Sequence, residues 1–353
     1  MANPIRVLVV DDSALVREIL STGLNMDPEI EVVGTATDPF NAKDKIMKLR
    51  PDVLTLDVEM PRMDGVEFLR QLMPQFPLPV VMVSALTERG QRITLEALGA
   101  GAVDFVTKPK SNLAQGLSGM MGQLVAKVKI ASRANVSQWK GRKVATHAQP
   151  PAARPLASST NQVIVIGAST GGTEAIREVV QGFPVTTPGV VVTQHMPAGF
   201  TKLFAERLNE LVPMQVKEAA DGDTIIPGRI LIAPGEKQMS VVRSGGSYKV
   251  VCKPGEKVNG HAPSVEVLMN SAATALGKHA VGIMLTGMGG DGARGLKAMR
   301  SAGARTLAQD EASSVVFGMP KVAWELGAAE RLVPLDKIAA TVMNWLSNKE
   351  ELV

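Results

Sequence analysis

The sequence predicts an α/β protein made of two successive parallel-sheet domains, and three observations support that prediction. Short apolar runs alternate with amphipathic stretches from the N-terminus, in the order of βα units. A polar, proline-rich segment interrupts this pattern, and a second βα series follows it. The 353 residues, 45% of them hydrophobic, are enough for two cores of ordinary size. We therefore expect a domain over residues 1–130, a linker over 131–160 and a second domain over 161–353.

The first domain is expected to contain five strands that alternate with helices. The strands are expected at Ile5–Val10, Glu31–Ala36, Val53–Asp57, Val80–Ser84 and Asp104–Thr107, and the helices near Ala14–Met26, Asn41–Arg50, Gly65–Met73, Gln91–Gly99 and Leu113–Ser132. Strands so rich in Val, Ile and Leu are typical of a parallel sheet covered by helices on both faces. This pattern predicts a (βα)5, flavodoxin-like fold that binds ligands at the carboxyl ends of its strands.

The segment 131–160 has the composition of a flexible linker, rich in Ser, Ala, Gln and Pro. It holds five basic residues and no acidic one, so it contributes +5 to a net charge of +4 and leaves −1 for the rest of the chain. Neither folded domain is therefore basic, which argues against nucleic-acid binding and against a DNA-binding helix-turn-helix module. Trp139 is unusual in a free tether and suggests that part of the linker docks on one domain.

The second domain is expected to be a doubly wound, mainly parallel α/β sheet. Its strands are expected at Val163–Ile166, Gly189–Thr193, Ile230–Ala233, Met239–Arg243, Tyr248–Cys252, Val281–Leu285 and Arg305–Ala308. The single cysteine, Cys252, excludes an internal disulfide, and its apolar neighbours indicate a core thiol. No stretch approaches the roughly 20 apolar residues that span a bilayer, and the N-terminus does not resemble a signal peptide. We expect a cytoplasmic protein without membrane insertion.

Polar side chains stand at the strand ends of the first domain. Asp11 and Asp12 follow the first strand, Asp57 closes the third, Ser84 closes the fourth and Lys108 follows the fifth. Each aspartate alone would suit a turn or a helix cap, but in a parallel sheet these ends converge on one edge. A carboxylate cluster needs a neutralising cation, and Mg²⁺ binds such oxygen ligands. The lysine and the serine add donors for a phosphoryl oxygen.

The order of these residues resembles the response-regulator receiver family. The matching motifs are Asp11-Asp12, the run Asp57–Gly65, Ser84-Ala85 and Lys108-Pro109. The resemblance implies that Asp57 is phosphorylated by a histidine kinase. It also implies a Mg²⁺ ion held by Asp12, Asp57 and the backbone carbonyl of Glu59, with Asp11 in support, and the switch residues Ser84, Lys108 and Phe105.

A glycine-rich turn, Gly167–Gly172, follows the first strand of the second domain and precedes a helix. It fits a G-x-S-x-G elbow that exposes Ser169 as a nucleophile, with the helix N-terminus turned to a developing oxyanion. The same pattern also suits a turn that packs a helix on a strand or binds phosphate.

A serine nucleophile needs a base, and the chain has four histidines. His147 lies in the linker, and His279 precedes a strand, where a surface role is expected. His195 lies just past the apolar strand that ends at Thr193, so it shares the sheet edge with Ser169. His261 lies on a loop that could also reach the site. We favour His195 as the base and keep His261 as the alternative.

A histidine base in turn needs an acid that orients its ring. Asp291 lies in a glycine-rich loop after the strand Val281–Leu285, so a third strand end supplies the third partner. Asp221 and Asp223 are more typical of turn residues. The chain order Ser, His, Asp differs from the Ser, Asp, His order of α/β-hydrolases, which disfavours a lipase-like enzyme.

These motifs resemble those of the chemotaxis protein-glutamate methylesterase (CheB) family. The matching segments are Gly167–Gly172, Gln194–Pro197, Ala233–Gly235, Pro263–Val265 and Gly287–Gly292. The resemblance implies a serine carboxylic-ester hydrolase with no cofactor in the esterase site. It implies a triad of Ser169, His195 and Asp291, with the backbone N–H groups of Thr170 and Met288 as oxyanion donors.

The resemblance also implies a substrate and a mode of control. The substrates are glutamate γ-methyl esters on methyl-accepting chemoreceptors, hydrolysed to glutamate and methanol for adaptation in chemotaxis, together with receptor glutamines that are deamidated. Phosphorylation of Asp57 activates the enzyme, and we expect the unphosphorylated first domain to cover the Ser169 edge. The alternatives are a phosphorylation-controlled esterase for another ester and a binding protein that has lost catalysis.

Two positions depart from the family pattern. Ala262 stands where the family has an arginine before Pro-Ser-Val, which affects expected substrate contacts. The C-terminal residues Lys349–Val353 differ from the aromatic pentapeptide with which some members bind receptors.

Overall fold

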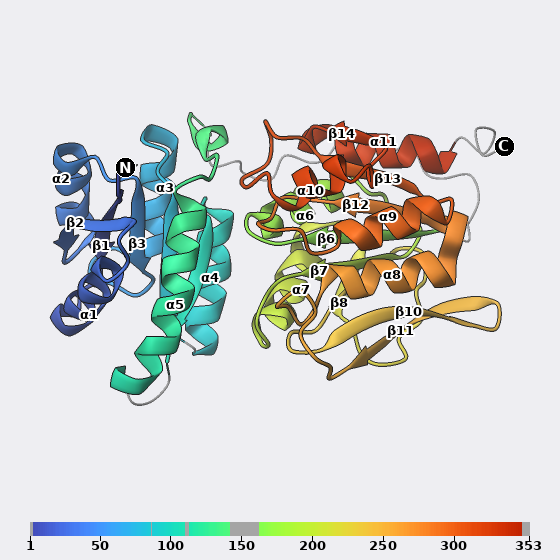
Figure 1. The fold of residues 1–353 in the computed structure, drawn as a ribbon, viewed down its shortest axis with the longest axis horizontal. Coiled ribbons are helices and arrows are strands. Elements are labelled where there is room, and N and C mark those ends of the chain that lie inside the picture. The colour runs from blue at the N-terminus through green and yellow to red at the C-terminus, as the bar shows by residue number, and fades with distance from the viewer. Residues whose placement is uncertain (1–2, 86, 110–112, 142–161, 348–353) are drawn as a thin grey trace. The chain divides into compact units, whose positions relative to one another are not determined.

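The computed structural model describes residues 3–85, 87–109, 113–141 and 162–347. The chain forms two compact units, residues 1–146 and 147–353, each with its own sheet (Figure 1). Of the predicted linker, residues 142–160, which include His147, lie outside the described residues. Within the described part, no helix is both long and apolar enough to cross a membrane.

The N-terminal unit is a five-stranded parallel sheet in the order β2-β1-β3-β4-β5. Its strands are β1 (Ile5–Val10), β2 (Ile30–Ala36), β3 (Val53–Asp57), β4 (Val80–Ala85) and β5 (Asp104–Lys108), and its helices are α1 (Ala14–Asn25), α2 (Pro39–Leu49), α3 (Gly65–Gln75), α4 (Glu88–Gly99), α5 (Leu113–Ala131) and the short η1 (Ser137–Trp139). All five residues of the central strand β3 are buried, as a strand covered on both faces requires. The predicted flavodoxin-like order is confirmed.

Four helices of this unit begin at polar caps. The side chains of Ser13, Asp38, Asp64 and Thr87 accept hydrogen bonds from the first turns of α1, α2, α3 and α4. After α5 the chain stays on the same unit. The Gly141 N–H donates to the Pro74 carbonyl at 2.9 Å, and Trp139 lies so close to Gly101 that a Cβ there would be 3.0 Å from the indole.

The C-terminal unit is built on a seven-stranded parallel sheet in the order β14-β13-β12-β6-β7-β9-β8. Its strands are β6 (Val163–Ala168), β7 (Val190–Gln194), β8 (Gln215–Glu218), β9 (Arg229–Ile232), β12 (Ala280–Met284), β13 (Arg305–Gln309) and β14 (Arg331–Val333), and its helices are α6 (Gly172–Gln181), α7 (Phe200–Leu211), α8 (Val265–Leu276), η2 (Gly277–His279), α9 (Ala293–Ser301), α10 (Met319–Glu325) and α11 (Leu335–Ser347). The doubly wound, mainly parallel prediction is confirmed. The edge strands β8 and β14 were not predicted, since four and three residues give little periodic signal.

An antiparallel hairpin, β10 (Gln238–Ser244) and β11 (Ser247–Lys253), packs with α8 and α9 in one core cluster on the sheet. Val165 of β6, Val241 of β10 and Leu268 of α8 are among its fully or almost fully buried members. Cys252 lies in this core, and burial raises the pKa of its thiol to about 11, so it is an unreactive packing residue.

Candidate functional site

The three central strands of the C-terminal sheet place Ser169, His195 and Asp291 at one edge. β6 lies between β12 and β7, and the three strands end in register. Ser169 directly follows β6, His195 directly follows β7, and Asp291 lies in the loop after β12. Backbone bonds extend the pairing beyond the strands, from His195 N–H to the Ala168 carbonyl at 3.1 Å and from Ser169 N–H to the Thr286 carbonyl at 3.0 Å.

The turn that carries Ser169 depends on closely approaching glycines. Gly171 has φ of 76°, a left-handed conformation that favours glycine, and directly precedes α6. A Cβ at Gly287 would lie 2.7 Å from the Ser169 Cβ, so only glycine leaves room for the serine. Ser169 itself is half-buried. The strand, the sharp turn and the helix form the elbow that the glycine pattern predicts.

Asp291 is bonded to the His195 ring and to the start of α8. The His195 Nε2 and the Asp291 Oδ2 are 2.8 Å apart, and their side chains are 7% and 2% exposed. Asp291 also accepts bonds from the Asn259 amide, the Ser264 hydroxyl and the Val265 N–H at 2.7–2.8 Å. Burial works to raise the pKa of Asp291, but the bonds from His195, Asn259 and Ser264 outweigh it and lower the pKa to about 2. Asp291 is therefore ionised at neutral pH and oriented toward the imidazole.

The second ring nitrogen of His195 is available for chemistry. Within the described residues, His195 Nδ1 is buried and has no hydrogen-bond partner. Since Nε2 is bonded to Asp291, Nδ1 is the nitrogen that can accept a proton. Gln194 holds this arrangement, because its Nε2 donates to the carbonyls of Ser169 at 2.9 Å and His195 at 3.2 Å. This role of Gln194 was not predicted from the sequence, although its place at the end of a buried strand was an available signal.

His261, the alternative base, lies against His195. The two imidazole rings stack with centroids 3.6 Å apart and planes 9° apart. Burial and the neighbouring His195 lower the pKa of His261 to about 4. Asp291 is hydrogen-bonded to His195 and not to His261. The structure thus pairs the predicted acid with His195 and brings both histidines to the site.

The other residues considered for this site lie as follows. Thr170 is buried directly before the Gly171 cap of α6, and Met288 is an exposed residue of the loop between β12 and Asp291. Asp221 accepts the Cys252 N–H, and Asp223 accepts the Ala220 N–H, so both are turn residues, as predicted.

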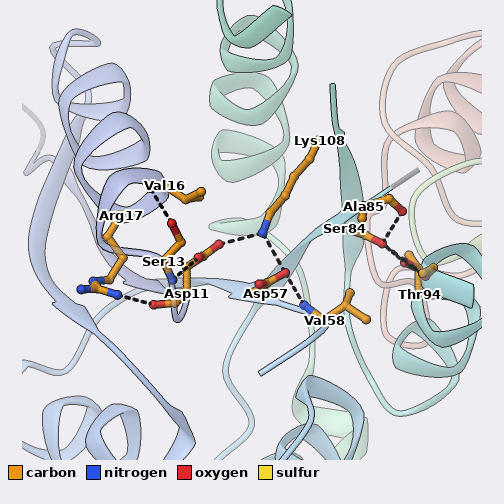
Figure 2. A network of polar contacts seen from close by, with 11 residues as sticks. Asp11, Ser13, Val16, Arg17, Asp57, Val58, Ser84, Ala85, Thr94 and Lys108 are labelled. Carbon is orange, nitrogen blue, oxygen red and sulfur yellow. Dashed lines mark hydrogen bonds and ion pairs between the residues drawn. The ribbon is translucent and has the colours of Figure 1, made fainter. Parts of the chain in front are cut away.

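The N-terminal unit carries an acidic cluster at the carboxyl end of its sheet (Figure 2). Carboxylate oxygens of Asp11, Asp12 and Asp57 lie within 4.8 Å of one another. The Lys108 ammonium is 2.9 Å from Asp11 and 2.9 Å from Asp57. Asp11 and Asp57 are buried, whereas Asp12 is exposed. Burial raises the pKa of Asp57 to about 6, and the Asp11 charge adds to that effect while Lys108 opposes it.

The oxygen-only donor set fits a hard divalent cation. Three carboxylates of this spacing can share such an ion, whose positive charge would offset the burial and the Asp11 charge that together raise the Asp57 pKa. The Glu59 side chain is exposed and lies 3.9 Å from Arg89, so its expected contribution is confined to its backbone carbonyl.

The two other predicted switch residues are buried. The Ser84 hydroxyl is turned toward α4, where it donates to the Gly90 carbonyl at 3.2 Å. It also accepts a bond from the Thr94 hydroxyl at 2.6 Å (Figure 2). Phe105 is 5% exposed, and the Lys127 ammonium lies 5.0 Å from the centre of its ring. The role of Thr94 was not predicted from the sequence, because a threonine inside an amphipathic helix carries no signal of a polar partner.

Comparisons with known proteins match both units. Residues 164–342 match the family model of the CheB methylesterase, and residues 7–117 match that of the response regulator receiver domain. A protein-glutamate methylesterase/protein-glutamine glutaminase from Syntrophotalea carbinolica is 65% identical over 99% of this chain and 99% of its own, and one from Sulfurimonas denitrificans is 51% identical over 98% and 99%. The crystal structure of the Thermotoga maritima CheB methylesterase catalytic domain has a TM-score of 0.51 at 35% identity, covering 52% of this chain and 98% of that chain.

Proposed function

The chain belongs to the CheB methylesterase family, and we propose that Ser169, His195 and Asp291 carry out its ester hydrolysis. It is a phosphorylation-controlled protein-glutamate methylesterase and protein-glutamine glutaminase that serves adaptation in chemotaxis. The observation that supports the triad best is the buried 2.8 Å pair of His195 Nε2 and Asp291 Oδ2, at the sheet edge where Ser169 follows β6. The pair leaves Nδ1 as the single basic nitrogen of His195.

The first half of the reaction acylates the enzyme. His195 takes the proton of the Ser169 hydroxyl on Nδ1, and the serine oxygen attacks the γ-carbonyl carbon of the substrate. The backbone N–H groups of Thr170 and Met288 donate to the oxyanion of the tetrahedral intermediate. The C–O bond to the methoxy group breaks, and the imidazolium returns its proton to the leaving group, which departs as methanol. Asp291 stabilises the imidazolium.

The second half frees the enzyme. A water molecule gives a proton to His195 and attacks the acyl carbon, and collapse of the intermediate releases glutamate and returns the proton to Ser169. Deamidation follows the same steps, with ammonia in place of methanol as the leaving group. Chemoreceptors that carry methylated glutamates are the substrates.

Control lies in the N-terminal unit. Asp57 accepts the phosphoryl group from a histidine kinase of the chemotaxis pathway. Asp12, Asp57 and the Glu59 carbonyl would hold a Mg²⁺ ion, with Asp11 in support, and the ion would supply positive charge against the phosphoryl oxygens. Lys108 and Ser84 bind the phosphoryl group, and Phe105 responds to it. We further propose that the unphosphorylated N-terminal unit lowers the esterase activity and that phosphorylation shifts the population toward a more active state.

Two assays test the catalytic part of the proposal. A serine-directed phosphonate should label one residue, Ser169, and block hydrolysis of a small ester, because Nδ1 of His195 activates that hydroxyl. Methylated receptor membranes should then release methanol with the wild-type protein. Failure of labelling would contradict the triad. Hydrolysis of the small ester without methanol release would instead indicate a different ester substrate.

A further inference from the structure

The loop between β11 and α8 contributes three groups to the catalytic acid and base. Asn259 and Ser264 donate to Asp291 at 2.8 Å, and His261 stacks on His195. The first two contacts orient the acid. The third has no place in the reaction steps above, because His261 makes no bond to Asp291 among the contacts of the described residues.

The His261 backbone is fixed on both sides. Its N–H and carbonyl pair with Val258 at 3.0 Å each. The Gln238 amide donates to the same carbonyl at 3.0 Å and accepts the Ser264 N–H at 2.8 Å. These bonds fix the backbone position from which the His261 side chain reaches His195.

The stack restrains the base where hydrogen bonds do not. The single bond from Nε2 to Asp291 leaves the His195 ring free to tilt about that bond. The His261 ring lies 3.6 Å from the His195 ring between centroids, and the two planes differ by 9°, so the rings are in van der Waals contact over the whole face. This contact opposes tilting of His195 and leaves no room for water on that side. The buried Nδ1 then keeps its direction.

The charge state of His261 suits this role. Burial and the neighbouring His195 lower the pKa of His261 to about 4, Lys257 acts in the same direction, and Asp291 opposes them. At neutral pH the ring is therefore uncharged. When His195 becomes an imidazolium during the reaction, an uncharged neighbour adds no repulsion, whereas a second cation at that distance would oppose proton transfer.

We propose that His261 is a positioning residue for the esterase reaction: its uncharged ring stacks on His195, fixes the plane of the base and takes no proton itself. The inference rests on the proposed function, because it takes His195 as the base.

Three substitutions test it in the full-length protein. His261→Phe keeps a flat ring but cannot carry a proton. His261→Gln removes the flat ring and keeps a polar side chain, and His261→Leu removes the flat ring and leaves an apolar side chain. His279→Gln, at an exposed histidine of the same unit, is the matched control. The measurements are kcat and KM for a small ester, the rate of phosphonate labelling, and the melting temperature.

The outcomes separate the roles. We expect His261→Phe to keep kcat within about threefold of wild type and to keep the shape of the pH profile, whereas the Gln and Leu variants lose at least about tenfold in kcat and in labelling rate with little change in KM. An inactive, folded His261→Phe would overturn the inference, since it would mean that His261 transfers a proton. Wild-type kcat in a folded Gln or Leu variant would overturn it as well. If Ser169→Ala and His195→Gln keep activity, the proposed function itself fails.

Discussion

The acidic cluster of the N-terminal unit should destabilise that unit when no cation is bound, and Asp57→Asn should relieve this cost. The pKa of Asp57 rises from 3.8 to about 6 because of its burial and, to a smaller extent, the Asp11 charge, against the opposing Lys108. Each pKa unit between the unfolded and the folded state corresponds to about 1.36 kcal/mol of the free energy of unfolding. The ionised Asp57 side chain therefore lowers the free energy of unfolding by about 3 kcal/mol. We expect Asp57→Asn to raise the free energy of unfolding by up to about that amount at pH 8 in EDTA.

The sign of the pH dependence follows from the raised pKa. The folded unit binds the Asp57 proton more tightly than the unfolded chain, so wild-type stability falls as pH rises from 3.8 to about 6. The advantage of the Asn variant should therefore vanish at or below the lower end of that range. Mg²⁺ should also reduce the stability advantage of Asp57→Asn, because the ion stabilises the wild-type protein, which has the Asp57 carboxylate.

Hydrogen exchange of the β3 amides, followed by mass spectrometry in full-length protein, measures the opening free energy of this unit. Asp44→Asn, which removes an exposed carboxylate on α2, is the control and should change little. Two results would contradict the cost assigned to ionised Asp57. One is an Asp57→Asn variant that is no more stable than wild type at pH 8 in EDTA, and the other is a stability advantage of this variant that grows toward acid pH.

Three further substitutions probe single contacts. Asp291→Asn should lower kcat at least about 100-fold with little change in KM, because it loses the charge that holds the His195 ring, and a variant with wild-type kcat would contradict that role. Gly287→Ala should lower the rate of phosphonate labelling of Ser169, since its Cβ would lie 2.7 Å from the serine Cβ, whereas unchanged labelling would show that the turn can move. Thr94→Val should raise the phosphorylated fraction at limiting acetyl phosphate, measured by phosphate-affinity electrophoresis. The Thr94 hydroxyl holds Ser84 toward α4, and an unchanged fraction would mean that this bond does not restrain the serine.

Much of the site could be predicted from the sequence, because sequence patterns show where residues lie relative to the ends of strands. Ser169, His195 and Asp291 each follow a buried apolar strand, and parallel strands bring such residues to one edge. The sheet order, with β6 between β12 and β7, was not visible in the sequence, yet it decides which strand ends are neighbours. The acidic cluster of Asp11, Asp12 and Asp57 was predictable for the same reason.

The contacts that hold these residues were not predictable, because they depend on loop conformation and side-chain direction. The sequence allowed His261 to reach the site but gave no reason to expect a stack on His195. Asp291 is also bonded to the first turn of α8, which follows β11 rather than its own strand. Ser84 was expected near the phosphoryl group, whereas its hydroxyl is bonded to Gly90 and Thr94. No periodic signal in a sequence distinguishes these rotamers.

We propose that one polypeptide couples phosphorylation at Asp57 to ester hydrolysis at Ser169. Methanol release from methylated receptor membranes, measured with and without acetyl phosphate and Mg²⁺, tests it most directly. We expect faster methanol release by the wild-type protein when acetyl phosphate is present. We expect Asp57→Asn to show basal release that does not respond to acetyl phosphate, and Ser169→Ala to show no release although its Asp57 is still phosphorylated. Methanol release by Ser169→Ala, or acceleration by acetyl phosphate in Asp57→Asn, would contradict it.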